Sequence, residues 1–566
     1  MLLDRIKRTK PSKIIITVFL AWFVMAFLIF PNINILSKVF LVDGQLDFSA
    51  FSRLFGSERA MRSLKNSFIL AFSLLVTTNV VGITTVLLVN YFDLKGRKML
   101  KAIYSIPLVY GGILVVSGYT LAYGPRGVIT DFLISVFPNL DPAWFSGYFG
   151  VLFIMTFTCT SNHILFLSKA IQNIDNQSVE AAKTMGASAM RIFRTIIIPS
   201  VKPTLFAISS LLFLTSLSAT SAPLLVGGTE FQTINPMIIT FSQTTQSRDL
   251  AALLSLFLGV ATLVILFLFN RNESQTLYSS GAKASAKLKR SKIDNKFLNI
   301  GAHILAYGIA IIYLIPLVIS VLYSFMSSTA IASGKISLSE LTLVNYLKVF
   351  TDSSAASPFI ISFIYALASS VLAVTVVVIA LRYIMKNQNK FGKLLENSLL
   401  IPMLLPATLI ALGLMLTYDS NRALMFNKTL IGTPYILLVA YIIVMLPFTL
   451  RMVKSSFFGI DKSFEEASQT MGASSFYTFT RVILPIVMPV ILSVIALNFN
   501  GRLADFDITV LLYHPLLKPL GIMIRGAVSS DTASLDDKAL VYVYSVILML
   551  FSVITLRMTR KRGVEE

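Results

Sequence analysis

Long apolar runs separated by short polar segments occupy nearly the whole 566-residue chain. A helix needs about 20 apolar residues to cross the hydrocarbon core of a bilayer. Runs of about this length number six in each half of the chain: Ile14–Phe30, Phe68–Tyr91, Ile103–Tyr123, Tyr148–Leu167, Thr204–Val226 and Leu250–Phe269, then Ile300–Phe325, Phe359–Ile384, Leu399–Tyr418, Thr433–Met452, Val487–Leu511 and Ala539–Leu556. The pattern predicts an all-α polytopic membrane protein with about 12 transmembrane helices.

Composition agrees with this prediction and excludes a soluble class. Charged residues make up 13% of the chain, hydrophobic residues 55%, and the mean hydropathy is +0.77, whereas soluble domains carry about 25% charged residues. The formal net charge of +21 would suggest nucleic acid in a soluble protein. Here the Lys and Arg residues lie between apolar runs, so we interpret them as a sign of membrane orientation and expect no nucleic-acid partner.

The distribution of Lys and Arg predicts which loops face the cytoplasm. With the N-terminus inside, the inside segments are basic, among them "DLKGRKMLK", "SAKLKRSKIDNK", "MKNQNKFGK" and "RMTRKRG". The opposite loops, such as "GGTEFQTINPMIITFSQTTQ", are poor in Lys and Arg, the exception being the segment with Arg53, Arg59 and Arg62. Cytoplasmic loops carry the excess of Lys and Arg, so we expect a multi-pass protein of the cell membrane with both termini cytoplasmic.

The two halves are repeats of one unit. The segment "SFI" at Ser67 recurs at Ser362, Ile106-Pro107 recurs at Ile401-Pro402, and about half of residues 174–203 match residues 460–489. We predict a first six-span half over residues 1–271, a basic cytoplasmic linker over residues 272–297, and a second half over residues 298–566. Both halves start inside, so the repeat is parallel and its axis runs along the membrane normal.

Two polar segments inside the repeat, residues 174–203 (loop 1) and residues 460–489 (loop 2), have a common pattern. Its residues are Glu180, Ala181, Ala182, Gly186 and Pro199 in loop 1, and Glu466, Ala467, Ser468, Gly472 and Pro485 in loop 2. Glu and Ala favour a short helix, and the Gly allows the left-handed turn that stops it. Ser188 or Ser474 then caps a second helix, which we expect the proline to end. The prediction is an exposed cytoplasmic helix–turn–helix in each half.

This pattern, EAA, three residues, G, nine residues and I-x-L-P, resembles the signature loop of ABC importer permeases of the binding-protein-dependent type. The resemblance implies a type I ABC importer permease fold. It also implies that a homodimer of ABC ATPase subunits docks on the loops, where Glu180 and Glu466 pair with basic groups, and that an external substrate-binding protein delivers the solute. ATP and Mg would be bound by the ATPase, because this chain has no GxxxxGK[ST] phosphate loop. We expect no enzyme, no catalytic residue and no cofactor in this chain.

The fused arrangement of the two halves looks most like that of ferric-iron permeases, which makes ferric iron the leading solute. Thiamine and phosphonate importers share this arrangement, and polyamine importers are more distant relatives. Three alternatives remain open: amphipathic interfacial helices in place of docking loops, a membrane scaffold or receptor, and an ion-coupled secondary transporter. The last would need buried ionisable residues for coupling, and the chain has few charges within its apolar runs.

Polar residues inside apolar runs are costly and are functional by default. The fifth and eleventh runs contain several, and the resemblance implies that the fifth run of each half borders the central pathway. Our candidates for the translocation pathway are Ser216, Ser218, Thr220, Asn498, Asn500, Arg502, Asp505 and Asp507. The competing interpretation is helix packing by Ser and Thr and a simple Arg502–Asp505 pair. Three scattered histidines predict no metal site, and we interpret His163 as a packed residue.

Overall fold

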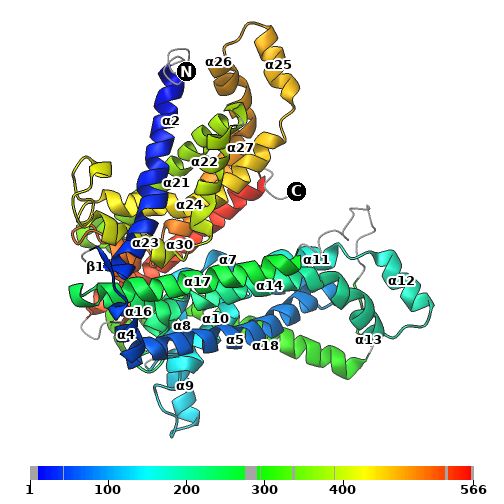
Figure 1. The fold of residues 1–566 in the computed structure, drawn as a ribbon. Coiled ribbons are helices and arrows are strands. Elements are labelled where there is room, and N and C mark those ends of the chain that lie inside the picture. The colour runs from blue at the N-terminus through cyan, green and yellow to red at the C-terminus, as the bar shows by residue number, and fades with distance from the viewer. Residues whose placement is uncertain are drawn as a thin grey trace.

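In a computed structural model of the chain, the described residues are 11–42, 44–125, 127–273, 290–293, 295–333, 338–387, 389–529 and 533–561. The described part is almost entirely helical, with one two-stranded antiparallel hairpin in which Leu41 lies opposite Leu46. Figure 1 shows two lobes of helices that meet at one end and diverge at the other.

The first half supplies most of the lower lobe in Figure 1. Its elements are α2 (Pro11–Phe23), η1 (Val24–Ile29), α3 (Phe30–Phe40), β1 (Leu41–Val42), β2 (Gln45–Leu46), α4 (Ser49–Gly56), α5 (Glu58–Val86), η2 (Leu87–Tyr91), α6 (Arg97–Tyr104), α7 (Ile106–Val109), α8 (Gly112–Tyr123), α9 (Val128–Val136), α10 (Gly147–Cys159), η3 (His163–Leu167), α11 (Ser168–Gln172), α12 (Asn176–Thr184), α13 (Ala189–Ile192), η4 (Phe193–Ile197), α14 (Ile198–Leu217), α15 (Ser221–Leu225), α16 (Ile234–Ser242), η5 (Thr245–Ser247) and α17 (Arg248–Glu273).

The second half supplies most of the upper lobe. Its elements are α18 (Lys296–Ser324), α19 (Ser328–Ser333), η7 (Leu338–Glu340), α20 (Val344–Thr351), α21 (Ser353–Asn387), α22 (Lys390–Leu400), η8 (Ile401–Met403), α23 (Ala407–Tyr418), η9 (Ala423–Met425), α24 (Tyr435–Phe458), α25 (Lys462–Thr470), α26 (Ser475–Thr478), η10 (Phe479–Ile483), α27 (Leu484–Arg502), α28 (Thr509–Leu512), α29 (Leu520–Ser529) and α30 (Leu535–Lys561).

The number of membrane spans agrees with the sequence pattern. Within the described residues, ten helices are long and apolar enough to cross a bilayer, and the number is twelve if each of two bent helix pairs counts as one span. The eleventh span ends earlier than predicted, because α27 stops at Arg502, whereas the fifth reaches Leu225 after a break in the helix where α14 stops at Leu217. Polar residues follow the ends of α14 and α27, and they form turns and short helices there.

Two predicted spans, Ile103–Tyr123 and Leu399–Tyr418, are each broken by a bend and are not continuous helices. The chain bends by 113° between α7 and α8 and by 109° between η8 and α23. At the first bend Gly112 has a φ of +61°, a left-handed conformation that interrupts a helix. At the second bend Pro406 has no N–H to donate and disfavours helical backbone in the preceding residue. Apolar length alone does not register these breaks.

The first spanning helix of the first half packs on the second half. Figure 1 places α2 in the upper lobe. The Trp22 indole donates to the carbonyl of Leu424 at 2.9 Å, and the Asn34 amide donates to the Thr417 hydroxyl at 3.0 Å. The hydroxyl of Tyr418 donates to the carbonyl of Ala26 on the same helix.

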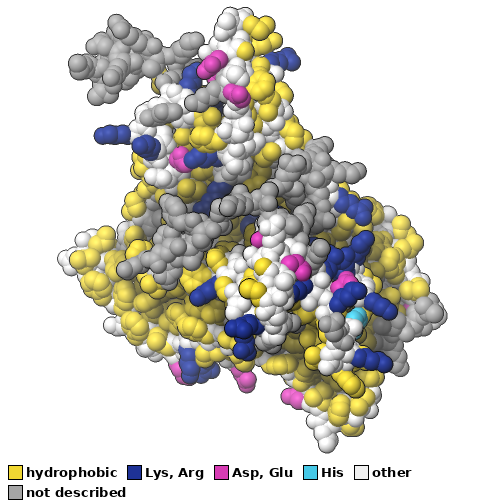
Figure 2. Space-filling view, turned by 90° about the vertical axis from the view of Figure 1, so that its right-hand side faces the viewer, with side chains coloured by type: hydrophobic (Ala, Val, Ile, Leu, Met, Phe, Trp, Pro, Cys, Tyr) yellow, Lys and Arg dark blue, Asp and Glu magenta, His cyan; other side chains and the backbone are white. Residues whose placement is uncertain are grey.

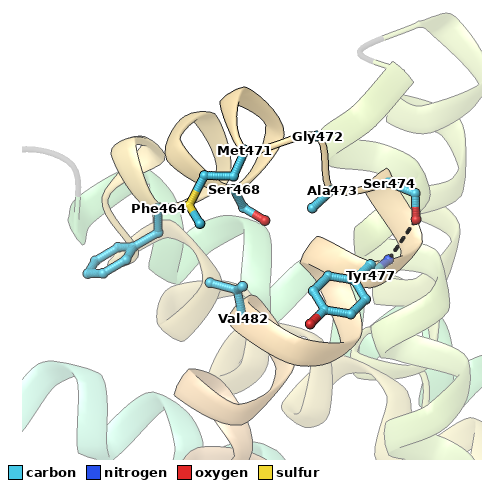
Figure 3. A pocket seen from close by; sticks show the side chains of 8 residues that line it. All are labelled: Phe464, Ser468, Met471, Gly472, Ala473, Ser474, Tyr477 and Val482. Carbon is cyan, nitrogen blue, oxygen red and sulfur yellow. Dashed lines mark hydrogen bonds between the residues drawn. The ribbon is translucent and has the colours of Figure 1, made fainter.

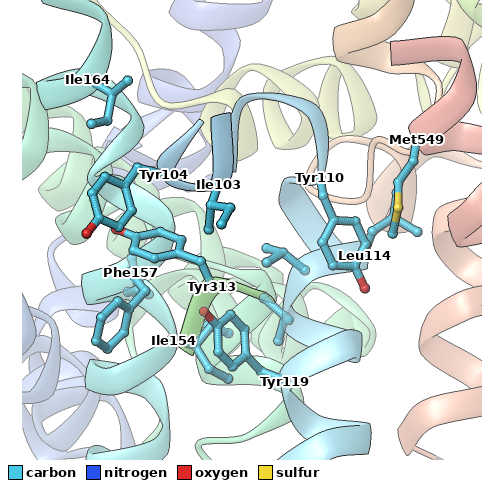
Figure 4. Packing of buried hydrophobic residues seen from close by; sticks show 14 of the residues in the cluster. Ile103, Tyr104, Tyr110, Leu114, Tyr119, Ile154, Phe157, Ile164, Tyr313 and Met549 are labelled. Carbon is cyan, nitrogen blue, oxygen red and sulfur yellow. The ribbon is translucent and has the colours of Figure 1, made fainter. Parts of the chain in front are cut away.

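The first helix of the second half, α18, packs in return on the first half. Tyr104 donates to the carbonyl of Ala306 at 2.8 Å, and the hydroxyls of Tyr110 and Ser320 lie 3.0 Å apart. Figure 4 shows the buried tyrosines of this contact packed together, with Tyr313 of α18 between side chains of the first half. The two halves therefore exchange their first helices, and the predicted boundary at residues 272–297 separates them along the chain but not in space.

Most of the predicted linker, residues 274–289 and 294, lies outside the described residues. Of the remainder, Ser291 exchanges backbone hydrogen bonds with the segment that follows α5, through the carbonyl of Tyr91 at 2.9 Å and the amide of Asp93 at 3.1 Å. The end of the linker is thus attached to the first half before α18 begins.

Candidate functional site

Loops 1 and 2 lie at the far, diverging ends of the two lobes, loop 1 as α12 and α13 and loop 2 as α25 and α26 (Figure 1). Figure 2 looks at the molecule from the side on which the lobes diverge, and it shows Lys and Arg side chains gathered across this face. A basic face at this end is what the charge distribution along the chain predicts for a cytoplasmic surface.

The first helix of each loop begins and ends in the same way. Asp175 accepts from the amide of Gln177 at 3.0 Å, and Asp461 accepts from the amide of Ser463 at 2.9 Å, so an aspartate caps each helix. Gly186 and Gly472 follow these helices with φ of +77° and +84°. The predicted left-handed glycine turn is confirmed in both copies.

The hydrogen bonds at the two glycines form a Schellman motif. In loop 1 the amide of Ala187 donates to the carbonyl of Ala182 at 3.0 Å, and the amide of Gly186 donates to the backbone carbonyl of Lys183 at 2.9 Å. In loop 2 the corresponding bonds run from Ala473 to Ser468 at 3.1 Å and from Gly472 to Gln469 at 2.9 Å. The two loops therefore have the same hydrogen-bonded backbone, although about half of their side chains differ.

The second helix of each loop begins at the predicted serine. The hydroxyl of Ser188 accepts from the amide of Arg191 at 3.3 Å, and that of Ser474 accepts from Tyr477 at 3.2 Å. Both predicted caps are confirmed.

The role predicted for the two prolines is wrong. Pro199 and Pro485 do not end a helix, because each is the second residue of a spanning helix, α14 or α27. A π-helical turn, η4 or η10, comes directly before each spanning helix. Proline has no N–H to donate to the carbonyl four residues earlier, and in an α-helix the proline ring clashes with that carbonyl. The wider π turn displaces that carbonyl, so the loop continues into the membrane span as one helical path.

The signature glutamates point into solvent. Glu180 is exposed and pairs with Lys183 one turn later at 3.1 Å, and Glu466 is exposed without an ion pair to any other described side chain. Met185 and Met471, each directly before the glycine, are 80% and 87% exposed. Ala181 and Ala467 are also exposed. Small, acidic and flexible apolar side chains thus share the outer surface of both loops.

Loop 2 encloses a groove of about 670 Å³ between its two helices. Figure 3 shows Phe464 and Met471 on one wall and Tyr477 and Val482 on the other. Phe464 is 52% exposed and Tyr477 is 56% exposed. The outer surface of loop 2 is therefore aromatic as well as acidic.

The pathway candidates of the first half are occupied by hydrogen bonds within their own lobe. Ser216 and Ser218 donate to carbonyls one turn earlier in α14, at 2.6 Å and 2.8 Å. The Thr220 hydroxyl accepts from the Asn235 amide at 3.1 Å, and the Asn235 carbonyl accepts from the Thr408 hydroxyl of the second half at 2.9 Å. The hydroxyls of Ser216 and Ser218 are thus bonded within their own helix, and Thr220 belongs to a polar bridge between the halves.

Asn498 and Asn500 join helices within the second half. Asn498 donates to the Thr449 hydroxyl on α24 at 2.8 Å, and Asn500 accepts from Ser552 on α30 at 2.7 Å.

The charged candidates separate into a pair and a single residue. Arg502 donates to Asp505 at 2.6 Å, and the other Asp505 oxygen caps α28 by accepting from Ile508 and Thr509. Asp507 lies close to Thr220 of the first half, and its Oδ1 is buried without a hydrogen-bond partner among the described residues. Of the eight pathway candidates, Asp507 is the one that has a buried side-chain atom without a hydrogen-bond partner among the described residues.

Two contacts near the candidate residues were not predicted. One is the bridge from Asn235 to Thr408, for which neither residue carries a distinguishing signal. The other is Arg382 on α21, whose guanidinium reaches Glu465 and Ser475 of loop 2. Arg382 lies inside the predicted span Phe359–Ile384, and a cation within an apolar run is itself a signal. The described residues place His163 as a fully buried side chain, 3.1 Å from the Asn79 carbonyl oxygen.

Comparisons with known proteins match the whole arrangement. A family model described as binding-protein-dependent transport system inner membrane component matches residues 66–272 and 377–561. The chain is 35% identical over 535 residues to the probable ABC transporter permease protein y4fN of Sinorhizobium fredii, covering 94% of this chain and 93% of that protein.

More distant relatives differ in the solute that their names give. The ferric transport system permease protein FbpB of Actinobacillus pleuropneumoniae is 24% identical over 512 residues, covering 88% of this chain and 71% of that protein. A putative 2-aminoethylphosphonate transport system permease protein, PhnV, of Salmonella typhi is 27% identical over 173 residues, covering 31% of this chain and 63% of that protein.

The two stretches that match the family model contain loops 1 and 2 and together exceed two-thirds of the chain. The structure adds the apolar spans and the shared loop backbone that such a permease requires. The chain therefore belongs to the binding-protein-dependent transport system inner membrane components, the multi-pass permeases of ABC importers.

Proposed function

We propose that this chain forms the transmembrane pore of an ATP-driven importer that receives ferric iron from an external binding protein and passes it to the cytoplasm. The observation that carries the proposal is the pair of solvent-exposed helix–turn–helix loops with one backbone design at the diverging ends of the two lobes. One chain with two such loops fits a partner with two equivalent grooves, that is, a homodimer of ABC ATPase subunits.

The contact that each loop makes with its ATPase subunit is of the helix-in-groove kind. Glu180 and Glu466 pair with a basic group in the groove, and Met185 and Met471 fill its apolar part. Exposure of all four side chains supports this role. Loss of a desolvated glutamate would cost about 2–5 kcal/mol of docking, which is enough to separate the subunits.

The work of ATP is transmitted through these loops. ATP-driven closure of the ATPase dimer draws the two loops together, and the lobes that carry them change from diverging inward to opening outward. The ATPase contacts the two states of the pore unequally, and this difference drives the change. Both termini lie on the cytoplasmic side in this proposal, on the same face as the loops.

Ferric iron is the proposed solute because of the relative named for ferric transport, and Asp507 supports a cation. Its buried, unpartnered oxygen lies at the contact between the two halves, near Thr220. Asp505 is saturated by Arg502 and by the cap of α28, so we assign it to structure. The alternative is an importer of thiamine, a phosphonate or a polyamine. Because one relative is named for 2-aminoethylphosphonate transport, the test below includes a phosphonate.

The test is ATPase activity and solute uptake by the purified complex in nanodiscs and liposomes. Candidate binding proteins are added empty and loaded with ferric iron, thiamine, a phosphonate or a polyamine. We expect stimulation by the iron-loaded protein alone, and its loss in the double variant Glu180→Ala/Glu466→Ala. Stimulation by a binding protein loaded with another solute would show that ferric iron is the wrong solute, and it would still support an ATP-driven importer. Uptake that persists in the double variant without any ATPase would establish an ion-coupled carrier instead.

A further inference from the structure

Arg382 holds loop 2 from the cytoplasmic end of α21. Its Nη2 donates to Glu465 Oε1 at 3.1 Å, to the Ser475 hydroxyl at 3.0 Å and to the Ser475 carbonyl at 3.3 Å. Its guanidinium carbon lies 5.0 Å from the centre of the Phe479 ring, within the range of a cation–π contact. The Arg382 side chain is 20% exposed, so these contacts are partly shielded from solvent.

The partners of Arg382 come from every segment of loop 2. Glu465 lies in α25, Ser475 begins α26 and Phe479 begins η10. Lys386, one turn further along α21, donates to the Ser475 hydroxyl at 2.8 Å. A lysine at position 382 would supply the charge but not the planar fork that bonds and stacks at once. One arginine therefore fixes the relative positions of three segments and one membrane helix.

The first half has no arginine at the position equivalent to Arg382. The alignment that pairs Ser67 with Ser362 and Ile106 with Ile401 places Leu87 at the position of Arg382. Val179 stands at the position of Glu465, and it is 3% exposed. Apolar burial therefore contributes to the seating of loop 1, and the ring of Phe193 in this loop lies 6.5 Å from that of Tyr91 in η2.

The helix that carries Arg382 is placed to pass a displacement on. α21 packs along α24 and α27, and α27 ends at Arg502, which pairs with Asp505 beside Asp507. Toward the other end of α21, the hydroxyl of Ser362 accepts a hydrogen bond from the backbone amide of Leu520 at 2.8 Å. A shift of loop 2 that moves α21 is therefore transmitted to the helices around the proposed pathway.

We infer that Arg382 is a positioning residue that couples loop 2 to α21, and that the two loops transmit ATP-driven movement unequally because loop 1 lacks this polar attachment. The inference rests on the proposed function, in which an ATPase displaces the loops. To the proposed function it adds a coupling residue that lies outside both loops, and a mechanical difference between the two halves.

The test compares Arg382→Met with the matched variant Leu87→Met, which places the same side chain at the equivalent position of the first half. Both are measured in the full complex with its ATPase and binding protein. We expect Arg382→Met to lower the solute transported per ATP hydrolysed about tenfold, the scale of a lost charge-assisted contact. Leu87→Met should stay within about twofold, and Arg382→Lys should fall between the two.

Amide hydrogen exchange separates positioning from folding and requires no transport. Residues 462–478 should exchange faster in Arg382→Met, while residues 176–192 should be unchanged in both variants. Wild-type exchange in Arg382→Met, or wild-type transport per ATP, would overturn the inference, and so would loss of the ATPase subunits from this variant. Failure of the proposed function would instead be seen in the wild type, as absence of stimulation by any loaded binding protein.

Discussion

Loops 1 and 2 have one backbone and two different sets of contacts. Both use an aspartate cap, a left-handed glycine and a serine cap in the same order. Loop 1 is held by the buried Val179, whereas loop 2 is held by the pair between Arg382 and Glu465 at 3.1 Å. The backbone is determined by a few residues with special conformations, and the remaining positions are free to differ between the halves.

The outer surfaces differ in the same way. At two positions where loop 1 has Ser178 and Arg191, loop 2 has Phe464 and Tyr477. Two identical ATPase grooves would therefore meet two unlike surfaces. The features common to both, a glutamate and a methionine at matching positions, are then the ones that both grooves can recognise. The features that differ can distinguish the two loops mechanically.

The largest expected effect comes from the feature that the loops share. Gly186→Val together with Gly472→Val places a β-branched residue at a positive φ in both turns, at a cost of at least 1–2 kcal/mol in each by order of magnitude. We expect the double variant to lose its ATPase subunits in co-purification. The two single variants should each recover less ATPase than the wild type, and by amounts similar to one another. Gly301→Ala in α18 is the control, because Gly301 has an ordinary helical backbone and open space around it. Normal recovery of ATPase in the double variant would contradict a common turn.

The second prediction concerns the side chains that seat each loop. Val179→Ala removes two buried methyl groups and should destabilise loop 1 by about 1–3 kcal/mol. Glu465→Ala should cost about 1 kcal/mol or less, because the pair is partly exposed. Hydrogen exchange should therefore accelerate more in α12 of the first variant than in α25 of the second. The reverse order would show that the polar attachment, and not apolar burial, is the stronger of the two.

Salt should distinguish the loops without any mutation. Raising the ionic strength from about 0.1 M to about 1 M shortens the Debye length from about 10 Å to about 3 Å. Exchange in residues 462–478 should rise severalfold at most, while residues 176–192 should respond less, because their Glu180–Lys183 pair is exposed. In Arg382→Met the salt response of loop 2 should disappear. If loop 2 of this variant responds to salt as the wild type does, the response comes from charges other than Arg382.

The smallest expected effect is on acidification. The amide and hydroxyl of Ser463 hold the pKa of Asp461 below its usual value of 3.8. Because the folded pKa is lowered, the charged cap stabilises α25 fully above the usual value, and this stabilisation is lost as the pH falls through the folded pKa. We expect the protection of the first turn of α25, which is the intrinsic exchange rate divided by the measured rate at each pH, to fall as the pH is lowered from about 5 to about 3.

The matched variant for this prediction is Asp461→Asn in the Arg382→Met background. Asn caps a helix without a charge, and the background removes the ion pair of Glu465. Its first turn should respond less to pH than that of Arg382→Met alone. An equal response in both would exclude Asp461 as the group that titrates.

The sequence predicted what depends on local rules. Apolar length predicted the membrane spans, and Gly186 and Gly472 predicted the left-handed turns, because these properties depend on one residue or one run. The bends at Gly112 and Pro406 were missed because the apolar pattern continues through them. Pro199 and Pro485 were misinterpreted because each lies in the first turn of a spanning helix, directly after a π turn, where proline is tolerated.

The contacts between distant segments could not be predicted from local patterns. Nothing near Asn235 indicates that its side chain reaches Thr408 of the other half. Nothing near Asp505 indicates that it caps α28 while Oδ1 of Asp507 is buried without a hydrogen-bond partner among the described residues. Arg382 is different, because its charge within an apolar run is visible in the sequence, and only its partners required the structure.

The exchange of first helices between the halves has a consequence for synthesis. When the first half has been made, α2 has no second half to pack on, and Tyr104 and Tyr110 have no α18 to contact. Neither half can complete its packing before the other exists, so the last steps of assembly follow insertion of the whole chain. Expressed as two separate pieces, the halves should each depend on the other for stability in the membrane. Fusion of the halves makes the partner available to each at a high effective concentration.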